Sequence, residues 1–298
     1  MKYYGAIEAG GTKFVCSVIS DPEHIWEEAR FPTTTPEETI SRTIEFFREQ
    51  QKKYPLCAFG IATFGPVDLN PDSPTYGYIT STPKPGWQNT DLLGPIKEAF
   101  GLPCAFDTDV NGAALAEYIW GNPDHVGSLV YYTIGTGVGA GAVINGKPLH
   151  GMLHPEAGHV MIRRDPEKDP YKGFCPFHGD CLEGLCAGPS IKQRFGKGAE
   201  TLDPEDPFWD IFAGYLAQAC MAQVLMLSPE KIVLGGGVMH QTHLFPRIRR
   251  QLLEMLNGYV KASRLVDHID TYITPPVLGD HAGVCGAMAL AMEAEKEA

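Results

Sequence analysis

Two loops rich in glycine and threonine each lie between two apolar, strand-like runs of this chain. The first loop reads Glu8-Ala9-Gly10-Gly11-Thr12-Lys13, and the second reads Thr133-Ile134-Gly135-Thr136-Gly137. Glycines allow backbone N–H groups to approach phosphate oxygens closely, and threonine hydroxyls add further donors. A short apolar run between the loops ends in the carboxylates Asp107 and Asp109. Two such loops with an acid between them predict a cleft that holds a polyphosphate from two sides.

Neither loop matches the commonest nucleotide motifs. In the first, Lys13 is displaced from the position that a P-loop requires and no helix follows. The second resembles a dinucleotide fingerprint, but an apolar run over 141–144 and an Asn145-Gly146 turn follow it. A Rossmann loop must open a helix, so this pattern indicates a hairpin instead. A third loop follows an apolar strand and suits a nucleotide base and ribose; it consists of Gly235, Gly236 and Gly237.

Length and composition limit the class of protein. A chain of 298 residues suits two domains, which we expect at 1–120 and 121–282, with a C-terminal helix at about 283–298 packing back on the first. The net charge of −12 disfavours nucleic acid as a partner. No signal peptide and no apolar run of about 20 residues is recognised, so we expect a cytoplasmic protein without a membrane partner.

Local patterns predict an α/β order of elements. Strands are expected at 2–7, 14–19, 56–63, 103–106, 127–134, 141–144 and 231–234, and helices at 91–100, 111–120 and over much of the chain after 208. Thr35, Pro36 and Glu38 form a helix-start signal with a capping box. The segment 70–90 has no period, and Trp87 within it favours a substrate loop over a flexible surface segment.

Two groups of residues carry candidate chemistry. Phosphoryl transfer to an alcohol needs a carboxylate that accepts the hydroxyl proton, and Asp107 and Asp109 compete for this role with that of a helix N-cap. Cys175, His178 and Cys181 form a close cluster typical of zinc, for which His159 and Cys186 are alternative fourth ligands. Four protein ligands would leave no open position, so the metal would be structural.

Together these motifs resemble the ROK family of repressors, open reading frames and sugar kinases, over nearly the whole chain. The resemblance implies a two-domain, actin-like (ribonuclease H-like) ATPase fold with an interdomain cleft and a zinc-bearing insertion in the second domain. It rests on the two phosphate loops, on Asp109 followed by Asn111 and Glu117, on Glu156-Ala157-Gly158-His159, and on a cysteine box ending at Glu183.

The resemblance also implies residue roles. Asp109 is expected to be the general base. Zinc is expected on His159, Cys175, His178 and Cys181. The expected ATP-binding residues are Gly10, Gly11, Thr12, Lys13, Thr133, Gly135, Thr136, Gly137, Gly235, Gly236 and Gly237. The expected sugar-binding residues are Gly65, Thr108, Asn111, Glu156, His159 and Glu183.

Three positions differ from the usual family pattern. Glu8 replaces an aspartate of the first phosphate motif, and His178 replaces a cysteine of the zinc box. Thr108 replaces an asparagine that serves glucose in the glucokinases of the family. The Thr82-Pro83-Lys84-Pro85-Gly86-Trp87 segment instead resembles the bacterial fructokinases.

The resemblance therefore implies an ATP-dependent fructokinase that uses Mg²⁺, carries Zn²⁺ and forms a homodimer. Its partners would be a small-molecule sugar and Mg-ATP. A mannokinase, a broad hexokinase and a non-catalytic sugar sensor remain as alternatives.

Overall fold

The computed structural model describes residues 1–298, which form two compact units. Unit 1 comprises Met1–Pro123, Gly146–Pro155 and Asp280–Ala298, and unit 2 comprises Asp124–Asn145 and Glu156–Gly279. The domain limits expected from the sequence stay a prediction, and they differ from these units in the placement of Gly146–Pro155.

Unit 1 contains both strands and helices. They are β1 (Tyr3–Ala9), β2 (Lys13–Asp21), β3 (His24–Pro32), α1 (Pro36–Gln50), β4 (Leu56–Thr63), β5 (Tyr78–Ile79), β6 (Thr90–Asp91), α2 (Leu93–Phe100), β7 (Cys104–Thr108), α3 (Asp109–Ile119), β10 (Lys147–Pro148) and α10 (Ala282–Glu297).

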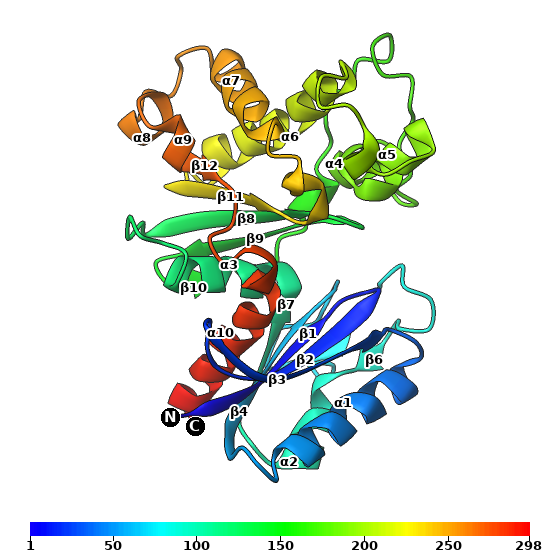
Figure 1. The fold of residues 1–298 in the computed structure, drawn as a ribbon, viewed down its shortest axis with the longest axis vertical. Coiled ribbons are helices and arrows are strands. Elements are labelled where there is room, and N and C mark those ends of the chain that lie inside the picture. Colours follow the sequence, from blue (N-terminus) through cyan, green and yellow to red (C-terminus); the bar gives the residue numbers. More distant parts are fainter. The chain divides into compact units, whose positions relative to one another are not determined.

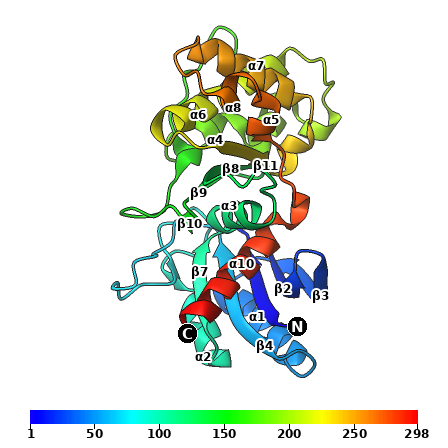
Figure 2. The same ribbon diagram turned by 90° about the vertical axis from the view of Figure 1, so that its left-hand side faces the viewer.

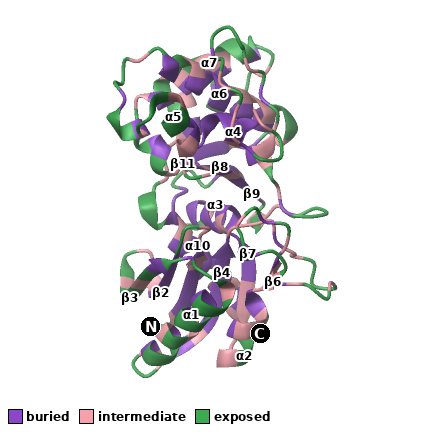
Figure 3. Ribbon diagram, turned by 90° about the vertical axis from the view of Figure 1, so that its right-hand side faces the viewer, coloured by how far each residue is buried: buried purple, intermediate pink, exposed green.

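A five-stranded sheet in the order β3-β2-β1-β4-β7 forms the centre of unit 1. Strands β1, β2 and β3 pair antiparallel, whereas β4 pairs parallel with β1 and with β7. Most residues of these strands other than β3 are buried (Figure 3). Because β1, β4 and β7 run parallel, their carboxyl ends meet at one edge of the sheet. At this edge β7 runs directly into α3.

Helices cover both faces of this sheet (Figure 1). On one face Phe59 of β4 packs edge-on against Phe47 of α1 and lies beside Phe100 of α2. On the other face α10 contacts β4 and also packs against α3 (Figure 2). This close approach depends on glycine, because a Cβ on Gly60 would stand 1.8 Å from the carbonyl oxygen of Ala287. The C-terminal helix is thus part of the first unit's core.

Unit 2 repeats the same hairpin-plus-parallel pattern. Its strands are β8 (Ser128–Ile134), β9 (Val138–Ile144), β11 (Lys231–Gly235) and β12 (Ile273–Thr274). Strand β9 is antiparallel to β8, and β11 is parallel to both β8 and β12. The helices are η1 (Ala157–His159), α4 (Leu182–Cys186), α5 (Gly188–Phe195), η2 (Ala199–Thr201), α6 (Phe208–Met226), η3 (Gly237–His240), α7 (Leu244–Leu256), α8 (Ser263–Val266) and α9 (Ile269–Tyr272), with η4 (Gly279–His281) at the junction with unit 1. Each phosphate-loop candidate therefore joins the two strands of an antiparallel hairpin.

The predicted elements are confirmed in type, with two informative differences. Strand β3 was not expected, because its solvent-facing residues alternate with only partly buried ones at the sheet edge. The capping signal is confirmed for Thr35, whose side chain accepts from the backbone N of Glu38 at 3.3 Å. The reciprocal half of the capping box is wrong, because the Glu38 carboxylate instead accepts from the Thr34 hydroxyl at 2.7 Å.

Trp87, which favoured a substrate loop over a flexible surface segment, is a core residue of unit 1, and the substrate-loop interpretation of 70–90 stays a prediction. The Trp87 side chain is fully buried, packs near Phe14 and Phe64, and donates from Nε1 to the carbonyl oxygen of Thr34 at 2.8 Å. The indole therefore fastens the 70–90 segment to the core of unit 1.

None of the helices has both the length and the apolar character that crossing a membrane would require.

Candidate functional site

In unit 1, the β1–β2 loop presents its polar groups to solvent. The backbone N of Gly10 donates to the carbonyl oxygen of Lys13 at 3.0 Å, which closes the turn. The side chains of Thr12 and Lys13 are exposed beyond it. A Cβ on Gly10 would stand 2.8 Å from that same carbonyl oxygen, so the tight turn requires glycine. The loop thus leaves an exposed hydroxyl and an ammonium group beside glycine backbone.

Glu8 stands at the end of β1, just before this loop. Burial raises the pKa of the Glu8 carboxyl above its usual range, while the Lys13 ammonium opposes that shift. A Cβ on Gly283, near the start of α10, would lie 2.5 Å from the Glu8 carboxyl carbon. Gly283 therefore leaves room for the side chain of Glu8, which is longer than that of the aspartate it replaces.

The start of α3 separates the two candidate carboxylates. The N-cap is Thr108, whose hydroxyl oxygen accepts from the backbone N of Asn111 at 3.1 Å, so neither aspartate is the cap. Asp107 is 2% exposed and hydrogen-bonded, whereas Asp109 is only partly buried, at the first helical position. Of the two aspartates, Asp109 is therefore the one that a ligand can reach more readily.

Asp107 is the centre of a hydrogen-bonded group that was not anticipated. Its Oδ1 accepts from Asn111 Nδ2 at 2.8 Å, and its Oδ2 bonds to His150 Nε2 at 2.8 Å. This contact raises the pKa of His150 above its usual value, against a smaller opposing effect of burial. No local pattern could have predicted the pair, because His150 comes from a distant loop.

In unit 2, the second phosphate loop is hydrogen-bonded to Glu183, one of the predicted sugar-binding residues. The backbone N of Val138 donates to Glu183 Oε2 at 3.0 Å, and a Cβ on Gly137 would lie 2.7 Å from the same oxygen. The backbone N of Gly188 donates to the carbonyl oxygen of Gly135 at 2.7 Å. Thr136 at the loop tip is exposed. The loop and Glu183 therefore form one packed arrangement.

The Glu156-Ala157-Gly158-His159 turn packs onto the same strand. A Cβ on Gly158 would stand 1.7 Å from the carbonyl oxygen of Val138, so only glycine allows this approach. Partial removal of its carboxyl from water, with the nearby charge of Glu183 as a smaller cause, raises the pKa of Glu156 to about 7, although much of the residue is exposed to solvent. The carboxylates of Glu156 and Glu183 are thus brought together beside the second loop.

Four side chains in unit 2 have the geometry of a zinc site. The ligand atoms of His159, Cys175, His178 and Cys181 all lie within 4.8 Å of one another. The His159 Nδ1 atom lies 3.7 Å from Cys175 Sγ and 3.6 Å from Cys181 Sγ. Tetrahedral zinc with ordinary Zn–S and Zn–N lengths separates such atoms by about 3.6 Å. The residues therefore fit the metal, whereas Cys186 is buried in α4 outside this group.

The glycines after β11 divide into structural and accessible positions. Gly235 is a buried strand residue. Gly236 has φ 89° and a Cβ there would lie 2.6 Å from the backbone of Ile134, so its glycine is explained by packing. Gly237 is exposed and has no atom within 4 Å of an added Cβ. Of the three, Gly237 is the position open to a ligand.

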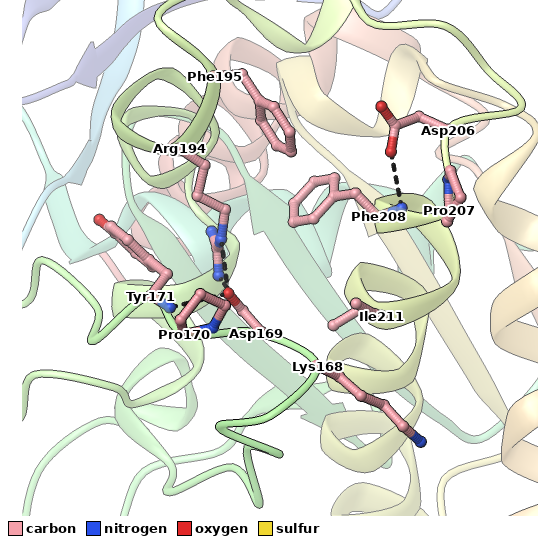
Figure 4. A pocket seen from close by; sticks show the side chains of 10 residues that line it. All are labelled: Lys168, Asp169, Pro170, Tyr171, Arg194, Phe195, Asp206, Pro207, Phe208 and Ile211. Atoms are coloured by element: carbon pink, nitrogen blue, oxygen red, sulfur yellow. Dashed lines mark hydrogen bonds and ion pairs between the residues drawn. The ribbon is translucent and has the colours of Figure 1, made fainter.

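A separate pocket of about 580 Å³ lies elsewhere in unit 2, at α5 and α6 (Figure 4). The Arg194 guanidinium lies over the Tyr171 ring and pairs with Asp169 at 2.7 Å. The same guanidinium donates to the carbonyl oxygen of Leu185 at 2.9 Å. Arg194 and Asp169 of the pocket are therefore paired with each other, and the pocket contains none of the predicted site residues.

The predicted residues are divided between the two units. Unit 1 holds Gly10, Gly11, Thr12, Lys13, Gly65, Thr108, Asp109 and Asn111. Unit 2 holds Thr133, Gly135, Thr136, Gly137, Glu156, His159, Cys175, His178, Cys181, Glu183, Gly235, Gly236 and Gly237. Within each unit a glycine loop is accompanied by carboxylates suited to sugar or phosphate chemistry.

Comparison with known proteins agrees with these features. The ROK family model matches residues 4–294. A fructokinase from Zymomonas mobilis is 46% identical over 99% of this chain and 98% of its own length. A fructokinase from Streptococcus mutans is 47% identical over 97% of both chains. The solved structure of a ROK family glucokinase from Streptomyces griseus, in complex with glucose and AMPPNP, has a TM-score of 0.77 and 22% identity, covering 98% of this chain and 99% of that chain.

The chain is therefore a member of the ROK family, with the actin-like ATPase fold of the ROK sugar kinases.

Proposed function

We infer that this chain is an ATP-dependent fructokinase, which transfers the γ-phosphoryl group of ATP to the 6-hydroxyl of fructose. Two fructokinases that are 46% and 47% identical to this chain over nearly its full length support both the activity and the sugar. The single structural observation that supports the mechanism is the contrast between buried Asp107 and accessible Asp109.

In the proposed reaction, Asp109 accepts the proton of the sugar hydroxyl. The hydroxyl oxygen then forms a bond to the γ-phosphorus, and the bond from that phosphorus to the bridging oxygen of ADP breaks. Such transfer needs positioning and charge neutralisation more than covalent participation of the protein.

The glycine loops would hold the phosphates through backbone N–H groups, with Thr12, Lys13 and Thr136 adding side-chain donors. Gly237 would leave room for the base and ribose. Mg²⁺, when bound, would neutralise charge on the β- and γ-phosphates. Glu8 is the carboxylate beside the first loop that suits its hydration shell.

Glu156, His159 and Glu183 would bind sugar hydroxyls, because carboxylates accept hydrogen bonds and imidazole can both donate and accept. Gly65 would contribute from unit 1. Thr108 and Asn111, the other expected sugar-binding residues of unit 1, are buried and would act by holding the start of α3, which carries Asp109. Zinc held by His159 Nδ1 and the three box ligands would fix the His159 ring and leave its Nε2 for the sugar.

The assembly and location belong to the same proposal. The protein would act as a cytoplasmic homodimer, with neither nucleic acid nor membrane as a partner. None of the eight cysteines forms a disulfide, which suits a reducing compartment. Light scattering of the purified protein tests the dimer.

Sugar-dependent release of ADP with Mg-ATP tests the activity, using fructose, mannose, glucose and N-acetylmannosamine. A preference for fructose in kcat/KM is expected. Turnover with mannose or glucose instead would overturn the sugar assignment. Sugar binding without any turnover would favour the sensor alternative.

Asp109→Asn tests the base in the same assay. We expect kcat to fall by about 10²- to 10⁴-fold, with ATP binding nearly unchanged, because only proton acceptance is removed. Near-normal turnover would remove Asp109 from this role.

A further inference from the structure

Thr33, which follows strand β3, is hydrogen-bonded to the first glycine loop at two points. Its hydroxyl donates to the carbonyl oxygen of Gly10 at 2.6 Å, and its backbone N donates to the carbonyl oxygen of Thr12 at 3.0 Å. The carbonyl oxygen of Lys13 accepts from the backbone N of Gly10. Three carbonyl groups of the loop are therefore occupied by donors of the protein itself.

The direction of these carbonyl groups matters for an anion. Phosphate oxygens are attracted by backbone N–H groups and repelled by carbonyl oxygens, which carry partial negative charge. Thr33 is 7% exposed, whereas the side chains of Thr12 and Lys13 are exposed. Bonding to the buried Thr33 therefore keeps the carbonyl oxygens of Gly10 and Thr12 directed at the protein and away from an anion in solvent.

The second glycine loop has the same arrangement at its first glycine. The backbone N of Gly135 closes the turn by donating to the carbonyl oxygen of Gly137 at 2.8 Å, as Gly10 does in the first loop. The carbonyl oxygen of Gly135 accepts from the backbone N of Gly188, which lies outside the hairpin, at 2.7 Å. Both hairpins thus have their first carbonyl group held from outside, by a backbone group in unit 2 and by a side chain in unit 1.

The position of Thr33 does not depend on its own hydroxyl. The carbonyl oxygen of the next residue, Thr34, accepts from Nε1 of the fully buried Trp87 at 2.8 Å. The backbone N of Thr34 donates to the hydroxyl of Thr39 in α1 at 3.1 Å. Variants that change only the Thr33 side chain should therefore fold.

We propose that Thr33 is a positioning residue for the phosphates of ATP, whose hydroxyl holds the Gly10 carbonyl group so that the loop presents donors rather than carbonyl oxygens to the nucleotide. The inference rests on the proposed function, in which this loop binds ATP. It adds a residue that lies outside the glycine motif and does not itself touch the nucleotide.

The first experiment compares Thr33→Val, which loses the hydroxyl, with Thr33→Ser, which keeps it. Steady-state kinetics would be measured with Mg-ATP and with fructose, and thermal unfolding would be followed in parallel. We expect Thr33→Val to raise KM for Mg-ATP about fivefold, as for loss of one neutral hydrogen bond, with KM for fructose within about twofold. Thr33→Ser should recover most of this loss.

Thr43→Val is the matched control. Thr43 is buried in α1 of the same unit, and its hydroxyl donates to the carbonyl oxygen of Thr39 at 3.0 Å. This variant therefore loses the same kind of hydrogen bond away from the loop, and it should lower the melting temperature while leaving both KM values unchanged. An unchanged KM for Mg-ATP in Thr33→Val would overturn the proposal. An equal rise of this KM in Thr43→Val, or equal rises for both substrates in Thr33→Val, would overturn it in favour of a structural role.

Titration calorimetry with Mg-AMPPNP in the absence of sugar tests the same inference without turnover. We expect Kd to be about fivefold higher in Thr33→Val than in the wild type, and an unchanged Kd would refute the proposal. Thr33→Cys, which keeps a side chain of similar size but donates only weakly, replaces the valine variant if the latter does not fold. Failure of the proposed function is distinct, because the wild-type protein would then bind the nucleotide without fructose-dependent turnover.

Discussion

Replacing Gly158 with alanine should displace the proposed sugar-binding residues of unit 2 without removing any functional group. The added Cβ would stand 1.7 Å from the carbonyl oxygen of Val138, whereas real Cβ atoms essentially never come closer than 3.0 Å to such neighbours. The difference, 3.0 − 1.7, requires a displacement of at least 1.3 Å between the turn and strand β9. The added Cβ is attached directly to the Gly158 backbone, and the atom that it meets belongs to the Val138 backbone. No flexible side chain can therefore absorb this shift.

The displacement would act directly on the proposed sugar ligands. Glu156 and His159 flank Gly158, and the backbone N of Val138 on the other side bonds to Glu183. A misplacement of about 1 Å can lower catalysis about 100-fold, which corresponds to roughly 2.7 kcal/mol. We therefore expect kcat/KM for fructose to fall by about that factor in the ADP-release assay.

Gly127→Ala is the control, because its added methyl group would meet only the carboxylate end of Glu230, at 3.2 Å. It should retain wild-type kinetics. If a folded Gly158→Ala protein kept kcat/KM for fructose within about twofold of the wild type, the argument that this packing positions the sugar ligands would be refuted.

Three further predictions concern metal, stability and pH. Cys181→Ala should lose stoichiometric zinc and lower the melting temperature, since a four-ligand site loses a thiolate; zinc retained in elemental analysis would contradict the ligand set. Arg194→Met should lower the free energy of unfolding by about 3 kcal/mol in urea titrations, because it leaves Asp169 buried without its cation; a loss below about 1 kcal/mol would contradict this. The pKa of His150 is raised in the folded state, so its stabilising contribution is complete below the unfolded value and is lost as pH rises through the folded value. The stability of the wild type relative to His150→Gln should therefore be greater at pH 5.5 than at pH 8.5, and a reversed order would refute the ion pair.

The charges around His150 support that sign. Asp107 accepts its hydrogen bond, and Glu293 of α10 adds a second negative charge that favours the protonated ring. Partial burial acts in the opposite direction, and His154 lies close enough to interact with it electrostatically. The net effect remains a raised pKa.

Much of the fold could be predicted because its signals are local. The β4 strand was expected with the limits that the structure has, and the Thr35 cap was identified from a few neighbouring residues. Both glycine loops were recognised as hairpin connections. Backbone preferences and apolar periodicity act over a few residues, so they can be read directly from the order of amino acids.

Other features were decided by contacts between distant segments. Strand β3 lacks a continuous buried face, and it exists because its backbone pairs with β2. Trp87 lies in an aperiodic segment, yet packing near Phe14 and Phe64 buries it completely. Neither outcome has a signal within its own neighbourhood of the chain.

The candidate site shows the same division. The sequence by itself determined the kinds of residue available: two glycine loops, a pair of aspartates after a strand, and a close cysteine–histidine cluster. Only the tertiary structure buried Asp107 against His150 and left Asp109 accessible. Only the tertiary structure brought His159 within 3.7 Å of the cysteine sulfurs. The sequence specifies the chemistry of each residue. Burial and distance depend instead on which remote segments pack together. These two quantities decide which of several equivalent side chains can react or bind.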